Sequence, residues 1–87
     1  MDNTMIYLLF TCDAWKSSSS MGMPIFVGTD AEYLFAKIRE CIENGDMCFE
    51  SEDYSVEEQL ELWEEQLDTD KLIYGYVEEY INNDMDL

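Results

Sequence analysis

The sequence predicts a single small α+β domain over residues 1–87, with elements in the order β-β-α-β-α-β. Apolar side chains recur every three to four positions over residues 31–44 and 56–67, which is the pattern of amphipathic helices. Short apolar runs rich in β-branched and aromatic residues surround these segments and are typical of strands. A mixed or antiparallel sheet with both helices packed on one face would bury the apolar stripes. The tail, residues 82–87, is expected to fray.

Two apolar segments precede the first helical pattern. Residues 5–12, MIYLLFTC, form a continuous apolar run that predicts a strand buried on both faces or nearly so. Residues 24–29, PIFVGT, predict a second short strand, with Pro24 tolerated at its first position. The serine-rich loop between them contains Trp15, for which two interpretations stay open. Trp15 is an aromatic anchor for a partner, or it folds back onto the sheet.

The first helix has a start signal and a stop signal. Thr29 followed by Glu32 predicts a capping box, in which each residue bonds the backbone amide of the other. Asn44-Gly45 predicts a left-handed stop at the end of the helix. Residues 47–51, MCFES, then predict a short strand.

The second helix begins with another capping box, formed by Ser55 and Glu58. Its apolar residues follow a helical spacing and predict one buried stripe of Val56, Leu60, Trp63 and Leu67. The segment after it, KLIYGYVEEYI over residues 71–81, is rich in tyrosine and β-branched residues and predicts the last strand.

Negative charge is concentrated in the second half of the chain. The formal net charge is −17, and residues 46–87, with fifteen acidic residues and only Lys71 as a base, carry −14 of it. Solubility of a small domain asks for a net charge of only about 2 to 8. Such a field repels nucleic acid and anionic membranes, and it favours a basic protein partner.

The acidic residues follow the helical spacing of the second helix. Acids three or four positions apart on a helix rise by about 5 to 6 Å, which is of the order of the phosphate spacing along a nucleic-acid strand. The sequence therefore predicts a surface that binds a basic partner as nucleic acid would. The candidate residues are Glu57, Glu61, Glu64, Glu65 and Asp68, helped by Glu50, Glu52 and Asp53, with Trp15 as an apolar contact.

The residue types of most catalytic and metal sites are missing. The chain has no histidine, no paired C-x-x-C motif and no glycine-rich phosphate loop. Cys12 beside Asp13 lacks a basic neighbour that would lower its pKa. Asp46 and the acids that follow it do not match the EF-hand calcium loop. We therefore expect no enzymatic activity, no cofactor and no metal.

Cysteine usage and hydropathy bear on location. Three cysteines lie in apolar runs, where free cysteine behaves as a small hydrophobe, and this favours a reducing compartment. The apolar run at residues 5–12 is too short for a secretory signal and lacks a basic flank. These features predict a soluble protein of the cytoplasm that does not bind membranes.

The stretch YLLFTCDAWKSSSSM, residues 7–21, resembles the opening of a family of small proteins from phages and mobile elements. These begin with a strand, Cys-Asp, Trp-Lys and a serine-rich loop that ends in Met. ENGDMCFES and YGYVEEY resemble later parts more loosely. In size and charge the chain is similar to the acidic inhibitors that phages make against host defence nucleases, including anti-CRISPR and anti-restriction proteins. The resemblance implies such an inhibitor, acting in the host cell.

Two principal hypotheses follow. In the first, the chain is a non-enzymatic inhibitor whose acidic surface occupies the basic nucleic-acid channel of a nuclease or effector complex. In the second, it is an acidic adaptor or a self-associating module, of which a homodimer is one form, that binds through an apolar edge strand without mimicking nucleic acid. The salt dependence of binding separates the two. A third hypothesis is a small enzyme, which is disfavoured because the sequence offers no histidine as a general base and little room for a substrate cleft.

Overall fold

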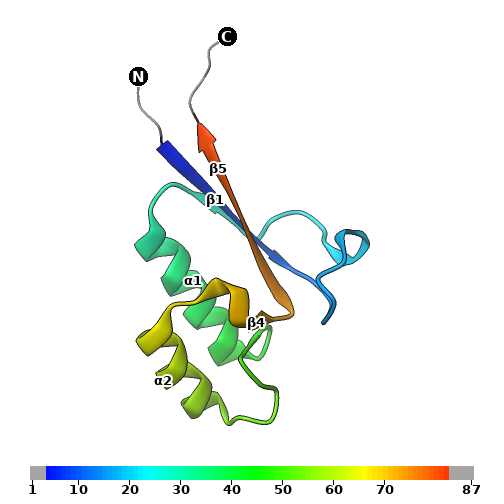
Figure 1. Ribbon diagram of the computed structural model, residues 1–87, viewed down its shortest axis with the longest axis vertical. Helices are drawn as coiled ribbons and strands as arrows, with labels where there is room; N and C mark the ends of the chain where they lie inside the picture. Colours follow the sequence, from blue (N-terminus) through cyan, green and yellow to red (C-terminus); the bar gives the residue numbers. More distant parts are fainter. Residues whose placement is uncertain (1–3, 83–87) are drawn as a thin grey trace.

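The computed structural model of the chain describes residues 4–82 and confirms the predicted α+β class. Helix α1 spans Ala31–Asn44 and helix α2 spans Val56–Gln66. Both helices lie on the same side of the main sheet (Figure 1). α1 packs directly on strands β1 and β2, and α2 packs on α1 and on strand β3. Most of the tail that the sequence predicts to fray lies outside the described residues.

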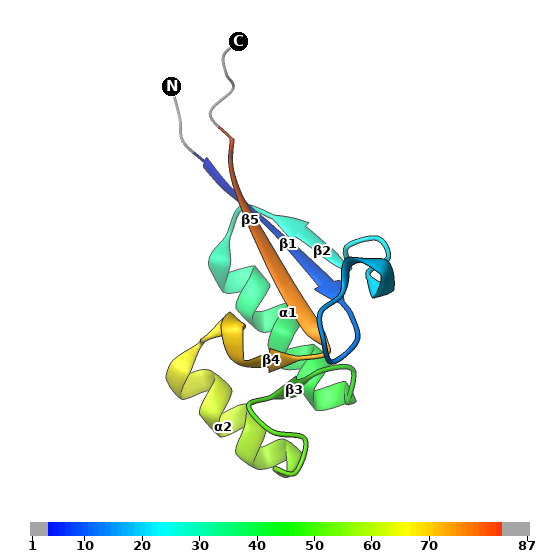
Figure 2. The same ribbon diagram turned by 45° about the vertical axis from the view of Figure 1, so that its right-hand side comes forward.

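A three-stranded antiparallel sheet is the larger of the two sheets (Figure 2). Its strands are β1, Thr4–Thr11, β2, Phe26–Gly28, and β5, Gly75–Asn82, in the order β2-β1-β5. β1 pairs with β5 over the full length of both strands, and with β2 over three residues. Leu9 lies at the centre, opposite Phe26 on one side and Val77 on the other. The two short 3-10 turns, η1 and η2, span Ser18–Ser20 and Thr69–Lys71.

The predicted single strand over residues 71–81 is wrong, because the chain turns at Tyr74. This residue has a φ of 69°, in the left-handed region that non-glycine residues seldom adopt. Before it, β4, Leu72–Ile73, pairs with β3, Cys48–Phe49, in a separate two-stranded sheet. After it, β5 joins the main sheet. The carbonyl of Tyr74 accepts a hydrogen bond from the Cys12 amide at 3.0 Å, which holds the turn in place.

The helix ends follow the predicted signals with one correction. Asp30 caps α1, since its side chain accepts from the Glu32 amide at 2.9 Å; the predicted cap, Thr29, is wrong. An aspartate one residue later offers a carboxylate, which the positive end of the helix dipole favours over a hydroxyl. Gly45 ends α1 with a φ of 83°, as predicted. The capping box of Ser55 and Glu58 is confirmed.

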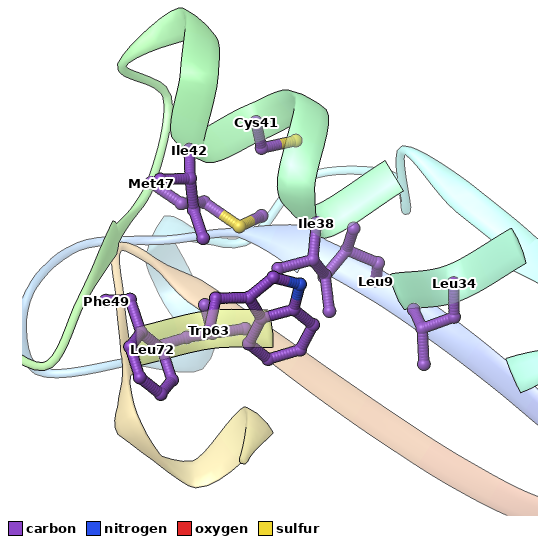
Figure 3. Packing of buried hydrophobic residues seen from close by; sticks show 9 residues of the cluster. All are labelled: Leu9, Leu34, Ile38, Cys41, Ile42, Met47, Phe49, Trp63 and Leu72. Carbon is purple, nitrogen blue, oxygen red and sulfur yellow. The ribbon is translucent and has the colours of Figure 1, made fainter. Parts of the chain in front are cut away.

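One apolar core lies between the helices and the two sheets (Figure 3). Trp63 is at its centre, and its ring meets those of Phe35 and Phe49 edge to face, with centroids 5.6 Å apart in each case. Elements from both halves of the chain therefore share one core. Its fully buried members are Leu9, Leu34, Ile38, Cys41, Ile42, Met47, Phe49, Trp63 and Leu72.

Two predictions about burial are wrong. Val56 and Leu67, at the two ends of the predicted stripe, are 44% and 41% exposed; Val56 is the first residue of α2, and Leu67 follows its last residue with a left-handed φ of 50°. Gln59 is buried in their place; its side chain accepts from the Phe49 amide at 2.9 Å and donates to the Tyr54 carbonyl at 2.8 Å. β1 is buried less than the predicted 'both faces or nearly so', since only Leu9 is fully buried, Thr11 is exposed and the other residues of the strand are half-buried.

Candidate partner-binding surface

Three predicted acids form a line along the outer side of α2. Glu57, Glu61 and Glu65 are spaced by four residues, so that each rises about 6 Å above the one before it. All three side chains are exposed. Within residues 4–82 their carboxylates make no hydrogen bond and no ion pair. We call these three residues the acidic row.

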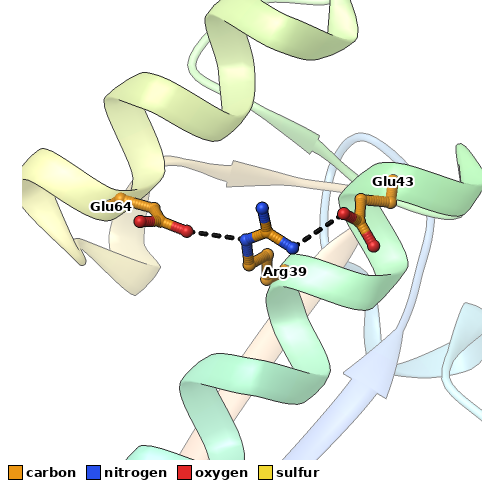
Figure 4. A network of polar contacts seen from close by, with 3 residues as sticks. All are labelled: Arg39, Glu43 and Glu64. Carbon is orange, nitrogen blue, oxygen red and sulfur yellow. Dashed lines mark hydrogen bonds and ion pairs between the residues drawn. The ribbon is translucent and has the colours of Figure 1, made fainter.

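Glu64, which the sequence places in the same surface, is engaged inside the molecule. Its carboxylate accepts from Arg39 Nε at 2.6 Å, and Arg39 Nη1 donates to Glu43 at 2.7 Å (Figure 4). These contacts join α2 to α1 across the outside of the helix pair. The carboxylate of Glu64 is therefore already paired with a cation of the chain, and a partner would have to compete with Arg39 for it.

Three more of the predicted acids also have internal roles. Glu50 pairs with Lys71 at 3.2 Å, across the ends of β3 and β4. Glu52 accepts from the Tyr74 hydroxyl at 2.7 Å, and this hydrogen bond raises the pKa of Tyr74. Asp68 caps the turn η2 by accepting from the Asp70 amide at 3.0 Å. The structure thus separates the predicted acids into those that hold the fold and those that face solvent alone.

Asp53 belongs with the acidic row in one respect. Its side chain is exposed, and its carboxylate makes no hydrogen bond and no ion pair in the described part of the chain, although its amide donates to Ser51 Oγ at 3.1 Å. It lies in the loop that leads into the first turn of α2. The unengaged carboxylates therefore begin just before the helix and continue to its last turn.

The acidic row costs the local fold more than it contributes. Like charges four residues apart destabilise a helix by about 0.2 to 0.5 kcal/mol per pair. Glu65 lies in the last turn of α2, where the helix dipole disfavours an acid and where no basic residue is present. The first-turn position of Glu57 is favourable on the same grounds. The unfavourable contributions outnumber the favourable one, so the row as a whole lowers the stability of the helix.

The four basic residues of the chain all lie in the described part, and each contacts an oxygen of the protein itself. Arg39 and Lys71 form the ion pairs above. Lys37 pairs with Glu40 at 3.5 Å, and Lys16 Nζ donates to the Asp70 carbonyl at 3.4 Å. Cations that neutralise the acidic row must therefore come from solution or from a partner.

A shallow groove runs between α1 and α2, beside the acidic row. One part, of about 290 Å³, has apolar walls from Phe35, Trp63 and Leu67. The other part, of about 340 Å³, is lined by Leu60 and Glu61. Arg39 and Glu64 line both parts. The groove offers an apolar contact next to the carboxylate of Glu61, which suits a side chain with an aliphatic stem and a charged end, such as lysine or arginine.

The loop that contains Trp15 is ordered by Asp13. Its carboxylate accepts from the Trp15 amide at 3.1 Å, from the Ser17 amide at 3.0 Å and from the Ser17 hydroxyl at 2.8 Å. The hydrogen bonds from Ser17 lower the pKa of Asp13. Trp15 itself is 85% exposed, so it does not fold back onto the sheet. The structure presents it as an aromatic side chain available for contact.

The cysteines show no activated thiol. Burial raises the pKa of Cys12, Cys41 and Cys48, which lowers the thiolate fraction at neutral pH. All three are free thiols. Among residues 4–82, no group of three or more cysteine or acidic side chains is arranged to hold a metal ion. No helix in that range is long and apolar enough to cross a membrane.

Two parts of this surface were not found from the sequence. The pairing of Arg39 with Glu64 joins residues 25 positions apart, and no local pattern predicts it. The difference between engaged and unengaged acids has the same origin, because it depends on where distant bases lie. A four-residue spacing of Glu57, Glu61 and Glu65 was the one available signal for the acidic row.

Comparisons with protein-family models, with curated proteins and with solved structures gave no match to this chain. The resemblance to small phage proteins therefore stays a prediction from the sequence.

Proposed function

We propose that the chain is a non-enzymatic, phage-type inhibitor that acts in the cytoplasm of a host cell. Its acidic row takes the place of nucleic-acid phosphates in the basic channel of a host defence nuclease, of the kind that anti-CRISPR and anti-restriction proteins block. The observation that carries the proposal is the line of three exposed carboxylates of Glu57, Glu61 and Glu65, which are left without a cation in the described chain.

The spacing of the row supports this reading. Its carboxylates rise in steps of about 6 Å, close to the spacing of successive phosphates in an extended strand and of the order of the 3.4 Å rise per phosphate in a duplex strand. Lysine and arginine side chains that line a nucleic-acid channel are long and flexible enough to meet either spacing. The groove beside Glu61 adds an apolar contact for the stems of such side chains.

The net charge supports the same partner chemistry. A protein of charge −17 is steered toward a basic surface, and such steering raises the association rate at low ionic strength. A small domain needs much less net charge than this to be soluble. Solubility also gives no reason to place acids in the last turn of α2, where the helix dipole makes them unfavourable. Binding to a cationic channel gives those carboxylates a stabilising partner that the isolated chain lacks.

The test neutralises the row and compares it with a matched variant. The row variant carries Glu57→Gln, Glu61→Gln and Glu65→Gln. The control carries Glu40→Gln, Asp46→Asn and Asp70→Asn, which change the net charge equally at exposed positions outside the row. Each protein is added to a panel of purified CRISPR and restriction nucleases, and DNA cleavage is measured. Circular dichroism checks that both variants fold.

We expect the wild-type chain to inhibit at least one nuclease of the panel and the row variant to inhibit it about 10- to 100-fold more weakly, since three charge pairs are lost. The control should lose less than about threefold, through long-range steering alone. Equal loss in both variants would show that only net charge matters. Inhibition that is unchanged between about 0.05 M and 0.5 M salt would contradict the proposal and favour an adaptor that binds by apolar contacts.

A further inference from the structure

Strand β5 is an open edge of the main sheet. It pairs with β1 along all of its residues, from Gly75 opposite Thr11 to Asn82 opposite Thr4. On its other side, no strand within residues 4–82 pairs with it. η2 and β4 contact β5 without forming a ladder. Figure 2 shows β5 at the outer side of the sheet, opposite β2.

The register identifies which backbone groups face outward. The Cys12 amide donates to the Tyr74 carbonyl, so this opposed pair is hydrogen-bonded across the two chain segments. Hydrogen-bonded pairs alternate along an antiparallel ladder. Tyr76, Glu78 and Tyr80 therefore direct their amides and carbonyls to β1. The residues that follow each of these, Val77, Glu79 and Ile81, direct theirs to the open edge.

An independent contact agrees with this alternation. The Leu9 carbonyl accepts from the Ile25 amide at 2.7 Å, on the β2 side of β1. Leu9 lies opposite Val77, so this carbonyl does not bond β5. The pair of Leu9 and Val77 is therefore a non-hydrogen-bonded one, and the polar backbone groups of Val77 point away from β1.

The open edge has one kind of protection against strand addition, its negative charge. Natural edge strands are short or bulged, or they carry proline or charged residues, lysine above all. β5 has eight residues, an unbroken register, no proline and no lysine, and its two charges are those of Glu78 and Glu79. Tyr80 and Ile81 are 52% and 59% exposed. A second chain segment can reach the edge.

The acids of β5 decide the kind of segment. In antiparallel pairing of β5 with a second copy about its middle, Glu78 and Glu79 would lie opposite or diagonal to the same acids, which destabilises a ladder. The carboxylate of Glu79 has no partner in the described chain, and that of Glu78 accepts only from the Tyr80 hydroxyl, at 2.9 Å. None of the four bases of the chain pairs with Glu78 or Glu79 in the described residues, and β5 itself has no base, so a basic segment of another protein is the partner whose charge complements this edge.

We propose that the outer edge of β5 binds an extended segment of a basic protein, which adds as a further strand with lysine or arginine next to Glu78 and Glu79. Backbone hydrogen bonds at Val77, Glu79 and Ile81 hold the segment, and the two acids select a basic sequence. This site goes beyond the proposed function, because it uses neither the acidic row nor mimicry of nucleic acid.

The first test uses a defined probe, the capped peptide Thr-Lys-Val-Lys-Thr-Lys-Val-Lys-Thr, and amide hydrogen exchange measured by NMR. We expect the peptide to slow exchange at Val77, Glu79 and Ile81 by about tenfold or more, since a new hydrogen bond covers each amide. The same peptide with glutamate for lysine should give no protection. A lysine peptide that shifts only resonances of α2, without protecting β5, overturns the proposal.

The second test removes one edge donor. Glu79→Pro deletes an amide that faces away from β1, and proline is tolerated at such an edge position. It should weaken peptide binding by about tenfold, whereas Glu79→Gln, which removes only the charge, should weaken it about threefold. Equal binding by the two variants contradicts strand addition. Ile81→Pro gives the same comparison nearer the strand end if Glu79→Pro does not fold.

Two further outcomes separate this site from its alternatives. Protection of the β5 edge that grows with protein concentration, without peptide, would mean that a second copy occupies the edge, and it would overturn the proposal. The row variant with three glutamines should bind the peptide at β5 as the wild-type chain does. Failure of nuclease inhibition and failure of strand addition are therefore distinguishable.

Discussion

Helix α2 and strand β1 differ in how burial is distributed over their residues. α2 turns Trp63 and Gln59 to the core and an acidic row to solvent. β1 is apolar along most of its length, yet only Leu9 is fully buried, and the sheet face away from the helices has no helix on it (Figure 2). The acidic row is thus on the helix side, whereas exposed apolar side chains occur on both sides, with Val27 on β2 and with Val56 and Leu67 at the ends of α2.

This difference predicts how substitutions in the two regions change the free energy of unfolding. The helix side combines the best-buried residues with the residues that oppose stability, whereas the sheet side has half-buried residues and an open edge. Substitutions on α2 should therefore produce both the largest losses and the gains in the free energy of unfolding. Substitutions on the outer sheet face should change stability little and change association more.

The largest expected effect is that of Trp63→Ala. This side chain is 1% exposed and touches Phe35 and Phe49, so its removal leaves a large cavity. We expect a loss of about 3 to 5 kcal/mol in the free energy of unfolding, measured by urea titration. Val27→Ala, on the exposed side of β2, is the control and should cost less than about 0.5 kcal/mol. Similar losses in both variants would remove the contrast between the two regions.

The next effect concerns Gln59, which links α2 to β3 and to the loop before the helix. Gln59→Leu keeps the volume but leaves the Phe49 amide and the Tyr54 carbonyl without their partner. We expect a loss of about 2 kcal/mol in the free energy of unfolding. The control is Gln66→Leu, whose amide oxygen only accepts from Lys71 near the surface, and which should cost less than about 1 kcal/mol. A stabilising Gln59→Leu would show that the buried amide is not needed for the fold.

A smaller effect of opposite sign is expected on the outer side of α2. Glu65→Lys replaces an acid in the last turn by a base, which the helix dipole favours, and removes repulsion from Glu61. We expect a gain of about 0.5 to 1 kcal/mol, seen as a higher melting temperature at low salt. The gain should shrink in 1 M salt, where charges are screened over about 3 Å. A loss of stability would mean that Glu65 has a structural partner.

The smallest effect is local and depends on pH. Hydrogen bonds lower the pKa of Asp13 in the folded chain, so the carboxylate stabilises the loop above the ordinary value of about 3.9. This stabilisation is lost as the pH falls through the lower, folded value. We expect amide exchange at Trp15 and Ser17 to increase relative to that of β1 over this acidic range, after correction for the intrinsic pH dependence of exchange. Asp13→Asn should show the faster exchange already at neutral pH.

The candidate site was predictable only in part. The helical spacing identified the acids of α2, and Glu57, Glu61 and Glu65 lie together on its outer side as expected. Glu64, Glu50, Glu52 and Asp68 have the same local signal but are held by Arg39, Lys71, Tyr74 and the Asp70 amide. A carboxylate that stabilises the fold and one that awaits a partner look alike in the sequence.

The sequence by itself determined the two helices, their ends at Gly45 and Ser55, the strand character of β1 and the distribution of charge. Helical spacing, capping and composition act over a few neighbouring residues, and for that reason they can be read in order along the chain. Only the tertiary structure decided that the chain changes sheets at Tyr74, that Gln59 is buried, and that β5 ends the sheet with an open edge. These features depend on contacts between residues far apart in the chain, such as Thr4 and Asn82, whose pairing no local pattern encodes.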